Sequence, residues 1–128
     1  MANEITFSGL LQYANPAYNI PTLSLSSGNI VLSITGKYYY RGTQSIPTTA
    51  GGTALNLGSV STPGGWLIIF NRDPTNYVQL MTAVSTGAVF ARINPTEAAL
   101  LRLDATVTAP AAIAHTAACI VEYLVLDS

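Results

Sequence analysis

The chain has 128 residues, of which only 9% are charged, and its formal net charge is −1. An ordinary globular domain has about a quarter charged residues, so the side chains that usually perform catalysis or bind metals and phosphates are scarce here. The near-neutral balance provides no basic stripe for a nucleic-acid backbone, which disfavours charge-driven nucleic-acid binding. Because 49% of the residues are hydrophobic, the composition indicates a surface partly hidden against protein partners.

The length fits one domain over residues 1–128, with a core that needs no disulfide or metal. Cys119 is the only cysteine and lies in an apolar run, which predicts a buried, reduced thiol and a reducing compartment. Met1–Ile5 lacks the basic and apolar regions of a signal peptide. The uncharged stretch Ala105–Val121 contains a proline, a histidine and several threonines, so we do not interpret it as a membrane-spanning helix.

Short apolar runs separated by turn-forming residues predict β-strands along the first third of the chain. Ile5–Tyr13 alternates in polarity and predicts the first strand. Prolines within Asn15–Ser27 cannot donate to a sheet ladder, so residues 12–29 are interpreted as an extended arm or loop with at most an edge strand. Asn29–Tyr40 is the next predicted strand.

The middle of the chain predicts further strands and one tight connection. Thr43–Gly52 is rich in turn residues, and Ala54–Val60 is a plausible short strand. Trp66–Phe70 is apolar throughout, which is typical of a strand covered on both sides. Asn71–Asn76 then indicates a turn, so Tyr77–Met81 is predicted to form a hairpin with the preceding strand.

Four residues of this connection have structural roles in turns. Pro74 presets φ at the second turn position, and Asp73 can accept hydrogen bonds from backbone N–H groups just beyond itself. Asn71 and Asn76 are typical turn residues. We therefore assign Asn71, Asp73, Pro74 and Asn76 to a structural turn.

The last third predicts three strands and contains one conflict. Val89–Ile93 and Ala118–Leu126 are β-type runs. Asn94–Glu97 has the signature of a helix start, but it also suits a turn before a strand at Ala99–Leu103. We favour the strand, because one short helix fits poorly between two strand-rich halves. About eight short antiparallel strands result, which indicates an all-β sandwich or barrel.

Residues for catalysis or metal binding do not form a recognisable set. His115 and Cys119 lie four residues apart, but a metal site needs three or four ligands and the chain has no other histidine or cysteine. Glu97 and Asp104 flank a predicted strand, as many surface pairs do. No G-x-S-x-G motif is present. The sequence therefore predicts no catalytic residue, no metal site, no cofactor and no enzyme.

The tyrosines are the candidate interface residues. Three consecutive ones, Tyr38, Tyr39 and Tyr40, point alternately to opposite faces of a strand, so at least one face presents a ring outward or into an interface. They are a subunit or partner contact, ordinary half-buried strand residues, or a platform that stacks on sugars. Tyr13 and Tyr18 belong to the arm, which either reaches a neighbour or folds back on its own domain.

Three segments, Gly65–Leu80, Ala99–Leu103 and Cys119–Leu126, together with the opening Met1–Thr6, resemble small virion structural proteins of tailed bacteriophages. In such proteins a strand, an N-x-D-x-T-N-Y-V-like hairpin, an R-L strand and a terminal E-Y-L strand recur. The resemblance implies a jelly-roll-like β-sandwich that decorates or cements the outside of the icosahedral head, often as trimers.

The resemblance transfers no catalytic residue. Asn71, Asp73, Asn76 and Tyr77 match the family's hairpin, where their role is structural, whereas Pro74 departs from it. The Thr43–Gly65 stretch does not align with the family.

The functional expectation is a non-enzymatic capsid decoration or cement protein, made in the host cytoplasm and located on the virion head surface. Its expected partners are itself, as a homotrimer, and the major capsid protein, with no nucleic acid, membrane or small-molecule substrate. The alternative is a tail-associated receptor- or glycan-binding module, in which Trp66 and Tyr38–Tyr40 supply stacking faces.

Overall fold

The computed structural model describes residues 3–15, 20–34, 38–60 and 65–127, with strand pairing alone described for the first two ranges. The contacts divide the chain into two compact units, Met1–Thr35 and Gly36–Ser128, whereas the sequence predicts one domain. The described residues form strands, turns and irregular segments, and no helix among them is long and apolar enough to cross a membrane.

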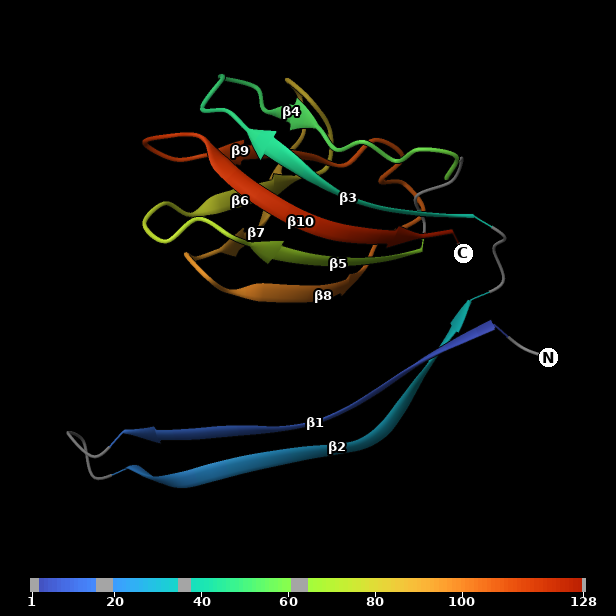
Figure 1. Ribbon diagram of the computed structural model, residues 1–128, viewed down its shortest axis with the longest axis vertical. Helices are drawn as coiled ribbons and strands as arrows, with labels where there is room; N and C mark the ends of the chain where they lie inside the picture. Colours follow the sequence, from blue (N-terminus) through green and yellow to red (C-terminus); the bar gives the residue numbers. More distant parts are fainter. Residues whose placement is uncertain (1–2, 16–19, 35–37, 61–64, 128) are drawn as a thin grey trace. The chain divides into compact units, whose positions relative to one another are not determined.

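The first unit is a β-hairpin (Figure 1). Strand β1 (Asn3–Asn15) pairs antiparallel with β2 (Ile20–Ile34). Residues 12–29, interpreted as an extended arm or loop with at most an edge strand, lie in this hairpin where they are described, at the end of β1 and in β2 from Ile20 onward. Pro21 is tolerated in β2 because both strands of a two-stranded sheet are edge strands, where a missing N–H donor need not break a ladder.

The second unit consists of two four-stranded antiparallel sheets, so the predicted all-β class with eight short sandwich strands is confirmed. One sheet has the order β3-β10-β5-β8 and the other β4-β9-β6-β7 (Figure 1). The strands are β3 (Tyr39–Ile46), β4 (Thr53–Ala54), β5 (Trp66–Asn71), β6 (Val78–Met81), β7 (Val89–Ile93), β8 (Ala98–Arg102), β9 (Ala111–Ala114) and β10 (Cys119–Leu126). The pairing is nested: β3 pairs with β10, β4 with β9, β5 with β8 and β6 with β7.

The core lies between the two sheets and is formed by alternate residues of each strand. From β5 it takes Leu67 and Ile69, and from β10 it takes Val121, Tyr123 and Val125, each at most 1% exposed. This alternation follows from the two-residue period of a strand, which sends every second side chain to the same face.

The predicted hairpin between Trp66–Phe70 and Tyr77–Met81 was wrong. β5 pairs with β10 and β8, whereas β6 pairs with β7 and β9 in the other sheet. The Asn71–Asn76 connection therefore crosses from one sheet to the other. Turn chemistry is local and does not determine whether the next strand returns beside the previous one or crosses the core.

Several predicted strand bounds also change. The run Asn29–Tyr40 contains the end of β2 and the start of β3 and is not one strand. Thr43–Gly52 begins in β3, which continues to Ile46, and only the first residue of Ala54–Val60 is in a strand. Strand β9 was missed because its four residues are mostly alanine, which has low β-propensity.

The strands predicted at Val89–Ile93, Ala99–Leu103 and Ala118–Leu126 are confirmed within one residue at each end. The turn before β8 contains the hydrogen bond that is typical of a helix start: the Glu97 carboxylate accepts from the backbone N–H of Asn94, three residues earlier, at 2.9 Å. Thr96, however, has a positive φ of 63°, which is incompatible with continuing a right-handed helix. The competing strand interpretation is therefore correct.

Candidate interaction surface

The sheet β3-β10-β5-β8 has one face on the core, and we call its opposite face the outer face. The strand register arranges the side chains of this face in rows across the four strands. The three rows, each read from β3 to β8, are Tyr39, Leu126, Trp66 and Arg102; then Arg41, Leu124, Ile68 and Leu100; then Thr43, Glu122, Phe70 and Ala98.

The outer face is apolar and partly exposed, although β5 was predicted to be covered on both sides. Tyr39 is 69% exposed, Ile120 51%, Phe70 38% and Leu100 37%. Soluble proteins rarely leave a contiguous apolar patch uncovered unless it binds a partner. This surface is the feature that sequence reasoning missed, and its signal was the presence of apolar residues on both faces of Trp66–Phe70.

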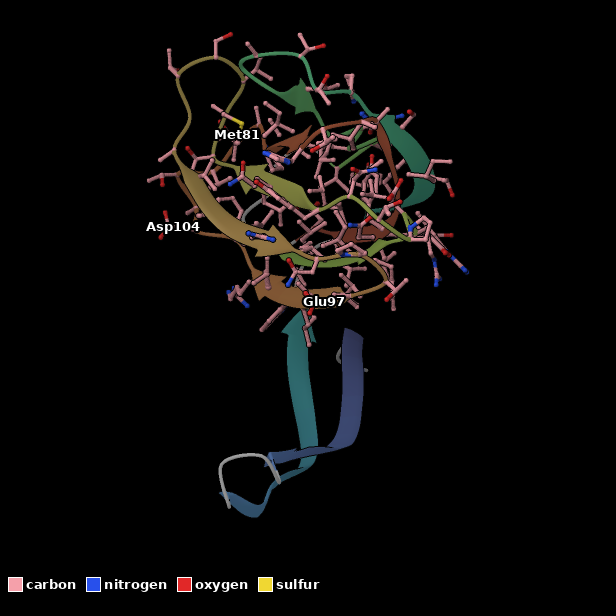
Figure 2. The ribbon with its side chains drawn as sticks, turned by 90° about the vertical axis from the view of Figure 1, so that its left-hand side faces the viewer. Met81, Glu97 and Asp104 are labelled. Atoms are coloured by element: carbon pink, nitrogen blue, oxygen red, sulfur yellow. The ribbon has the colours of Figure 1, made fainter. Side chains whose placement is uncertain are left out.

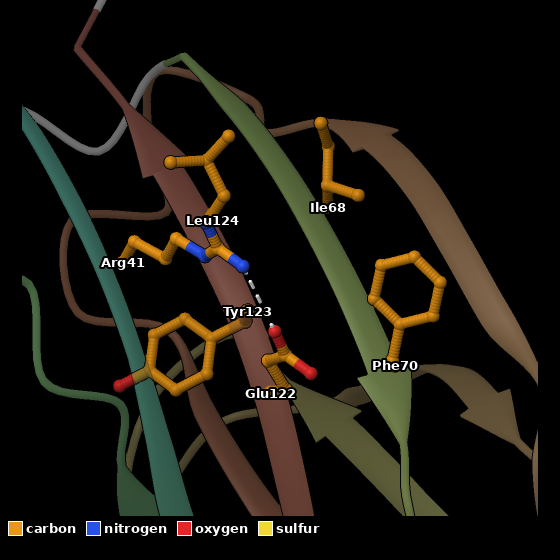
Figure 3. Close-up of a pocket in the computed structure, with 6 residues that line it drawn as sticks. All are labelled: Arg41, Ile68, Phe70, Glu122, Tyr123 and Leu124. Atoms are coloured by element: carbon orange, nitrogen blue, oxygen red, sulfur yellow. Dashed lines mark hydrogen bonds and ion pairs between the residues drawn. The ribbon is translucent and has the colours of Figure 1, made fainter.

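A shallow hollow of about 220 Å³ lies in the middle of the outer face, and Figure 3 shows residues that line it. Ile68, Phe70 and Leu124 form its apolar wall, and Arg41 and Glu122 its polar side. The hollow is small and largely apolar, so it suits the insertion of a protein side chain better than the binding of a polar metabolite.

Charged groups lie beside and among these apolar side chains. Glu122 accepts hydrogen bonds from Arg72 Nη2 at 2.6 Å and Arg72 Nε at 3.0 Å, and from Arg41 Nη2 at 3.3 Å. These bonds, those from Arg72 first, hold the pKa of the Glu122 carboxyl below its usual value. The Arg72 guanidinium also lies over the Phe70 ring, 4.8 Å from its centroid, and the Arg102 guanidinium lies over the Trp66 ring at 5.5 Å. Aromatic and arginine side chains are both enriched at protein–protein interfaces.

The structure separates the candidate tyrosines. Tyr39 lies on the outer face and is 69% exposed, and Tyr38, just before β3, is 42% exposed. Tyr40 packs against the core, with its ring centroid 5.7 Å from that of Tyr123. In the hairpin, Tyr13 lies opposite Leu23 in the register, and Tyr18 lies outside the described residues.

Tyr123 connects the core to the polar edge of the sandwich. Its side chain is 1% exposed, and its hydroxyl lies 2.8 Å from Gln44 Oε1 and 2.9 Å from the Asn56 carbonyl oxygen. Burial, followed by the neighbouring Tyr40, raises the pKa of Tyr123 to about 12. The hydroxyl therefore keeps its single proton throughout the neutral range and donates it to one or the other of these acceptors.

We expect Tyr123→Phe to lower the free energy of unfolding by about 1 kcal/mol at pH 7, because it removes the hydrogen bond that the buried hydroxyl makes to a part-buried acceptor. A folded-state pKa above the unfolded value of 10 gives stability that is present below pH 10 and is lost as the pH rises through about 12. Urea unfolding at pH 7, 9, 10 and 11 measures both effects. Wild type should lose stability above pH 10 more steeply than the variant; equal slopes would contradict this prediction.

The connection between β5 and β6 is held by two side chains. Asp73 Oδ1 accepts hydrogen bonds from Thr75 N at 2.8 Å and Asn76 N at 2.6 Å, and these bonds, that from Asn76 first, lower the pKa of Asp73. Asn71 is 1% exposed, and its Nδ2 lies within 3.2 Å of three backbone carbonyl oxygens. Pro74 is exposed beside them.

His115 and Cys119 have different surroundings. His115 is exposed and stacks on the Tyr77 ring at a centroid distance of 4.5 Å, and the Arg92 guanidinium lies 3.7 Å from that ring's centroid. Cys119 is a free, buried cysteine, as predicted, and burial raises the pKa of its thiol. Its Sγ lies 3.4 Å from the Asn76 carbonyl oxygen, to which it donates.

The two carboxylates that flank β8 are engaged locally. Glu97 caps Asn94 N, and Asp104 accepts hydrogen bonds from Thr106 N at 2.9 Å and Thr106 Oγ1 at 2.6 Å. Figure 2 shows the two labelled carboxylates apart from each other. Across the described ranges, no group of three or more histidine, cysteine or acidic residues is placed to hold a metal ion.

Partly exposed apolar side chains therefore lie together on the outer face. Comparison with protein-family models, curated proteins and solved structures finds no match to this chain.

Proposed function

We propose that this chain is a non-enzymatic virion structural protein, which decorates or cements the outside of a bacteriophage head as a homo-oligomer bound to the major capsid protein. The observation that carries the proposal is the outer face, whose partly exposed apolar side chains lie beside arginine and glutamate side chains. Such a surface is suited to protein partners.

The strand order supports the jelly-roll-like part of the proposal. When the sandwich strands β3 to β10 are numbered one to eight, the sheets have the orders 1-8-3-6 and 2-7-4-5. A double-sheet jelly roll has eight strands, and its nested pairing arises when one long antiparallel ribbon wraps around a core. Viral capsid proteins use this architecture, although the link from fold to function is an analogy.

The mechanism is bridging. A protein that contacts neighbouring capsid subunits adds contacts that must break before the shell can open, which stabilises the head against internal pressure. Contacts that are weak individually become effective together when many linked copies bind one shell. The chain itself performs no chemical step.

The decisive test is whether the purified protein binds expanded phage heads. Co-sedimentation should bring it down with the heads, and gold-labelled antibody should mark the head surface of virions. Protein that stays in the supernatant, together with label confined to the tail, would reject the head role. Binding to host surface polysaccharide would then support the tail-associated alternative.

We expect the purified protein to have the mass of a trimer in both low and high salt, because apolar contacts are not screened by ions. Multi-angle light scattering at about 20 mM and about 500 mM salt measures this directly, conditions that span Debye lengths from about 20 Å to about 4 Å. A monomer at micromolar concentration would count against self-association, and dissociation in high salt alone would indicate a contact dominated by charge.

A further inference from the structure

The β1–β2 hairpin has an apolar face along most of its length. The register places four pairs of apolar or aromatic residues opposite each other: Ile5 and Leu32, Phe7 and Ile30, Leu11 and Leu25, and Tyr13 and Leu23. On β1 these positions are all odd-numbered, so they share one face of the strand. The intervening positions on that strand are mainly polar, with Leu10 as the clearest exception.

A β-bulge keeps this face continuous on β2. The apolar positions of β2 are odd-numbered at Leu23 and Leu25 but even-numbered at Ile30 and Leu32, so regular alternation would place the two pairs on opposite faces. The register shifts between Ser8 and Leu10, which adds one residue on β2. One extra residue reverses the alternation, and both pairs then belong to the same face.

This hairpin needs a surface to pack on. An isolated two-stranded hairpin is at best marginally stable in water, and this one carries a row of apolar positions. Its shorter strand has 13 residues and is about 44 Å long, whereas the longest strands of the outer face have 8 residues and span about 27 Å. Because the hairpin is longer than the outer face, one such face covers only part of its length.

The charged residues favour a hairpin, and not the outer face of a second copy, as the surface that packs on the outer face. The outer face holds three arginines, Arg41, Arg72 and Arg102, and one acidic residue, Glu122. Two such faces would oppose like charges, which costs free energy at an interface. The hairpin has one charged residue, Glu4, and no cation, so it brings no repulsion to these arginines.

We propose that the β1–β2 hairpin of one copy packs, through the face that holds Leu11 and Leu25, on the outer face of a neighbouring copy. The inference rests on the proposed self-association and identifies the two surfaces that produce it. It also explains why β5 is apolar on both faces: its outward residues Ile68 and Phe70 belong to an intermolecular core.

Two full-length variants test the two surfaces, each with a control that carries the same substitution elsewhere. Phe70→Ser removes an apolar side chain from the outer face; Phe90→Ser is its control, since Phe90 is 42% exposed on the other sheet. Leu25→Ser alters the apolar face of the hairpin; Leu10→Ser, at the opposite strand parity, is its control. We expect Phe70→Ser and Leu25→Ser each to raise the dissociation constant about 30-fold, and the controls to leave it within about threefold.

Mixing the two variants distinguishes exchange between copies from packing within one chain. The Phe70→Ser copy keeps an intact hairpin and the Leu25→Ser copy an intact outer face, so the mixture should form heterodimers at a concentration where each variant alone is monomeric. One variant carries an inert tag that increases its mass, so light scattering distinguishes the heterodimer from either variant alone. Circular dichroism checks that each variant is folded. If a serine variant does not fold, the threonine variant at the same position is used in its place.

Each outcome decides between the proposals. Heterodimers in the mixture support the exchange of hairpins. Variants that stay oligomeric, or a mixture that stays monomeric, overturn it while leaving the proposed virion role intact. Wild-type protein that is itself monomeric overturns both the hairpin contact and the proposed self-association.

Discussion

Replacing Asn71 by aspartate is expected to destabilise the sandwich by about 3–5 kcal/mol at pH 7, the range for a buried charge without a partner. Asn71 Nδ2 lies 2.8 Å from the Asn76 carbonyl oxygen and 3.2 Å from those of Ile93 and Asn94. In the variant a carboxylate oxygen replaces this donor and faces three acceptors at hydrogen-bond distance. The loss is large because Asn71 is 1% exposed, so water cannot compensate.

The pH dependence of the Asn71→Asp variant gives a second, independent readout. Burial and the facing carbonyl groups raise the folded-state pKa of the new carboxyl, so the variant regains stability as the pH falls toward the unfolded value of about 3.9. Urea unfolding at pH 4 and pH 7 should show a smaller deficit at pH 4. Asn71→Ala is the control and should show the same deficit, about 2 kcal/mol, at both pH values. An aspartate variant as stable as wild type would disprove the role of Asn71.

Gly65→Ala is expected to cost about 3 kcal/mol, because the added methyl group has no space. An ideal Cβ at Gly65 would overlap the Leu126 carbonyl oxygen and lie 2.9 Å from its carbonyl carbon. Both atoms belong to the backbone of β10, so the clash is removed only if the start of β5 moves. That movement would strain the hydrogen bond from Leu103 N to the Gly65 carbonyl oxygen, which is 2.8 Å long.

Gly42→Ala is the matched control. A Cβ at Gly42 would also come close to other atoms, 2.5–2.9 Å from the hydroxyl oxygen and two ring carbons of Tyr40, but these belong to a side chain, which can shift at a lower cost than the backbone of β10. Thermal unfolding followed by circular dichroism should therefore show a drop in Tm for Gly65→Ala at least twice that of the control. Equal drops would show that the β5–β10 edge accommodates the methyl group. Trp66 pairs with Leu126 in the register, so the Gly65 variant should also weaken self-association.

The outer face and the hairpin account for the low content of charged residues in the chain. A composition with 9% charged residues cannot cover both the outer face of the sheet and a hairpin of 13 and 15 residues with polar groups. Three of the four arginines lie beside apolar side chains of the outer face, where Arg72 and Arg102 lie over aromatic rings. Such stacking keeps part of each ring out of water.

Local patterns in the sequence were sufficient for the elements whose structure is decided locally. Val89–Ile93 and Ala118–Leu126 predicted strands because alternation and β-branched residues act within a few residues. Asp73 binds N–H groups two and three residues ahead, and this chemistry needs no distant partner. The all-β class and the buried thiol of Cys119 follow from the same short-range evidence.

The tertiary structure alone decided what depends on residues far apart in the chain. The partners of β5 are β10 and β8, about 30 to 60 residues away, and no turn signal encodes that choice. Only this pairing shows that Phe70 faces outward and that Tyr40 turns to the core while Tyr39 does not. In the hairpin, a single bulge decides which residues share a face, and a pattern of alternating residues cannot reveal it without the register. Apolar periodicity thus determined that strands form, and long-range pairing decided which apolar side chains of the sandwich stay partly exposed.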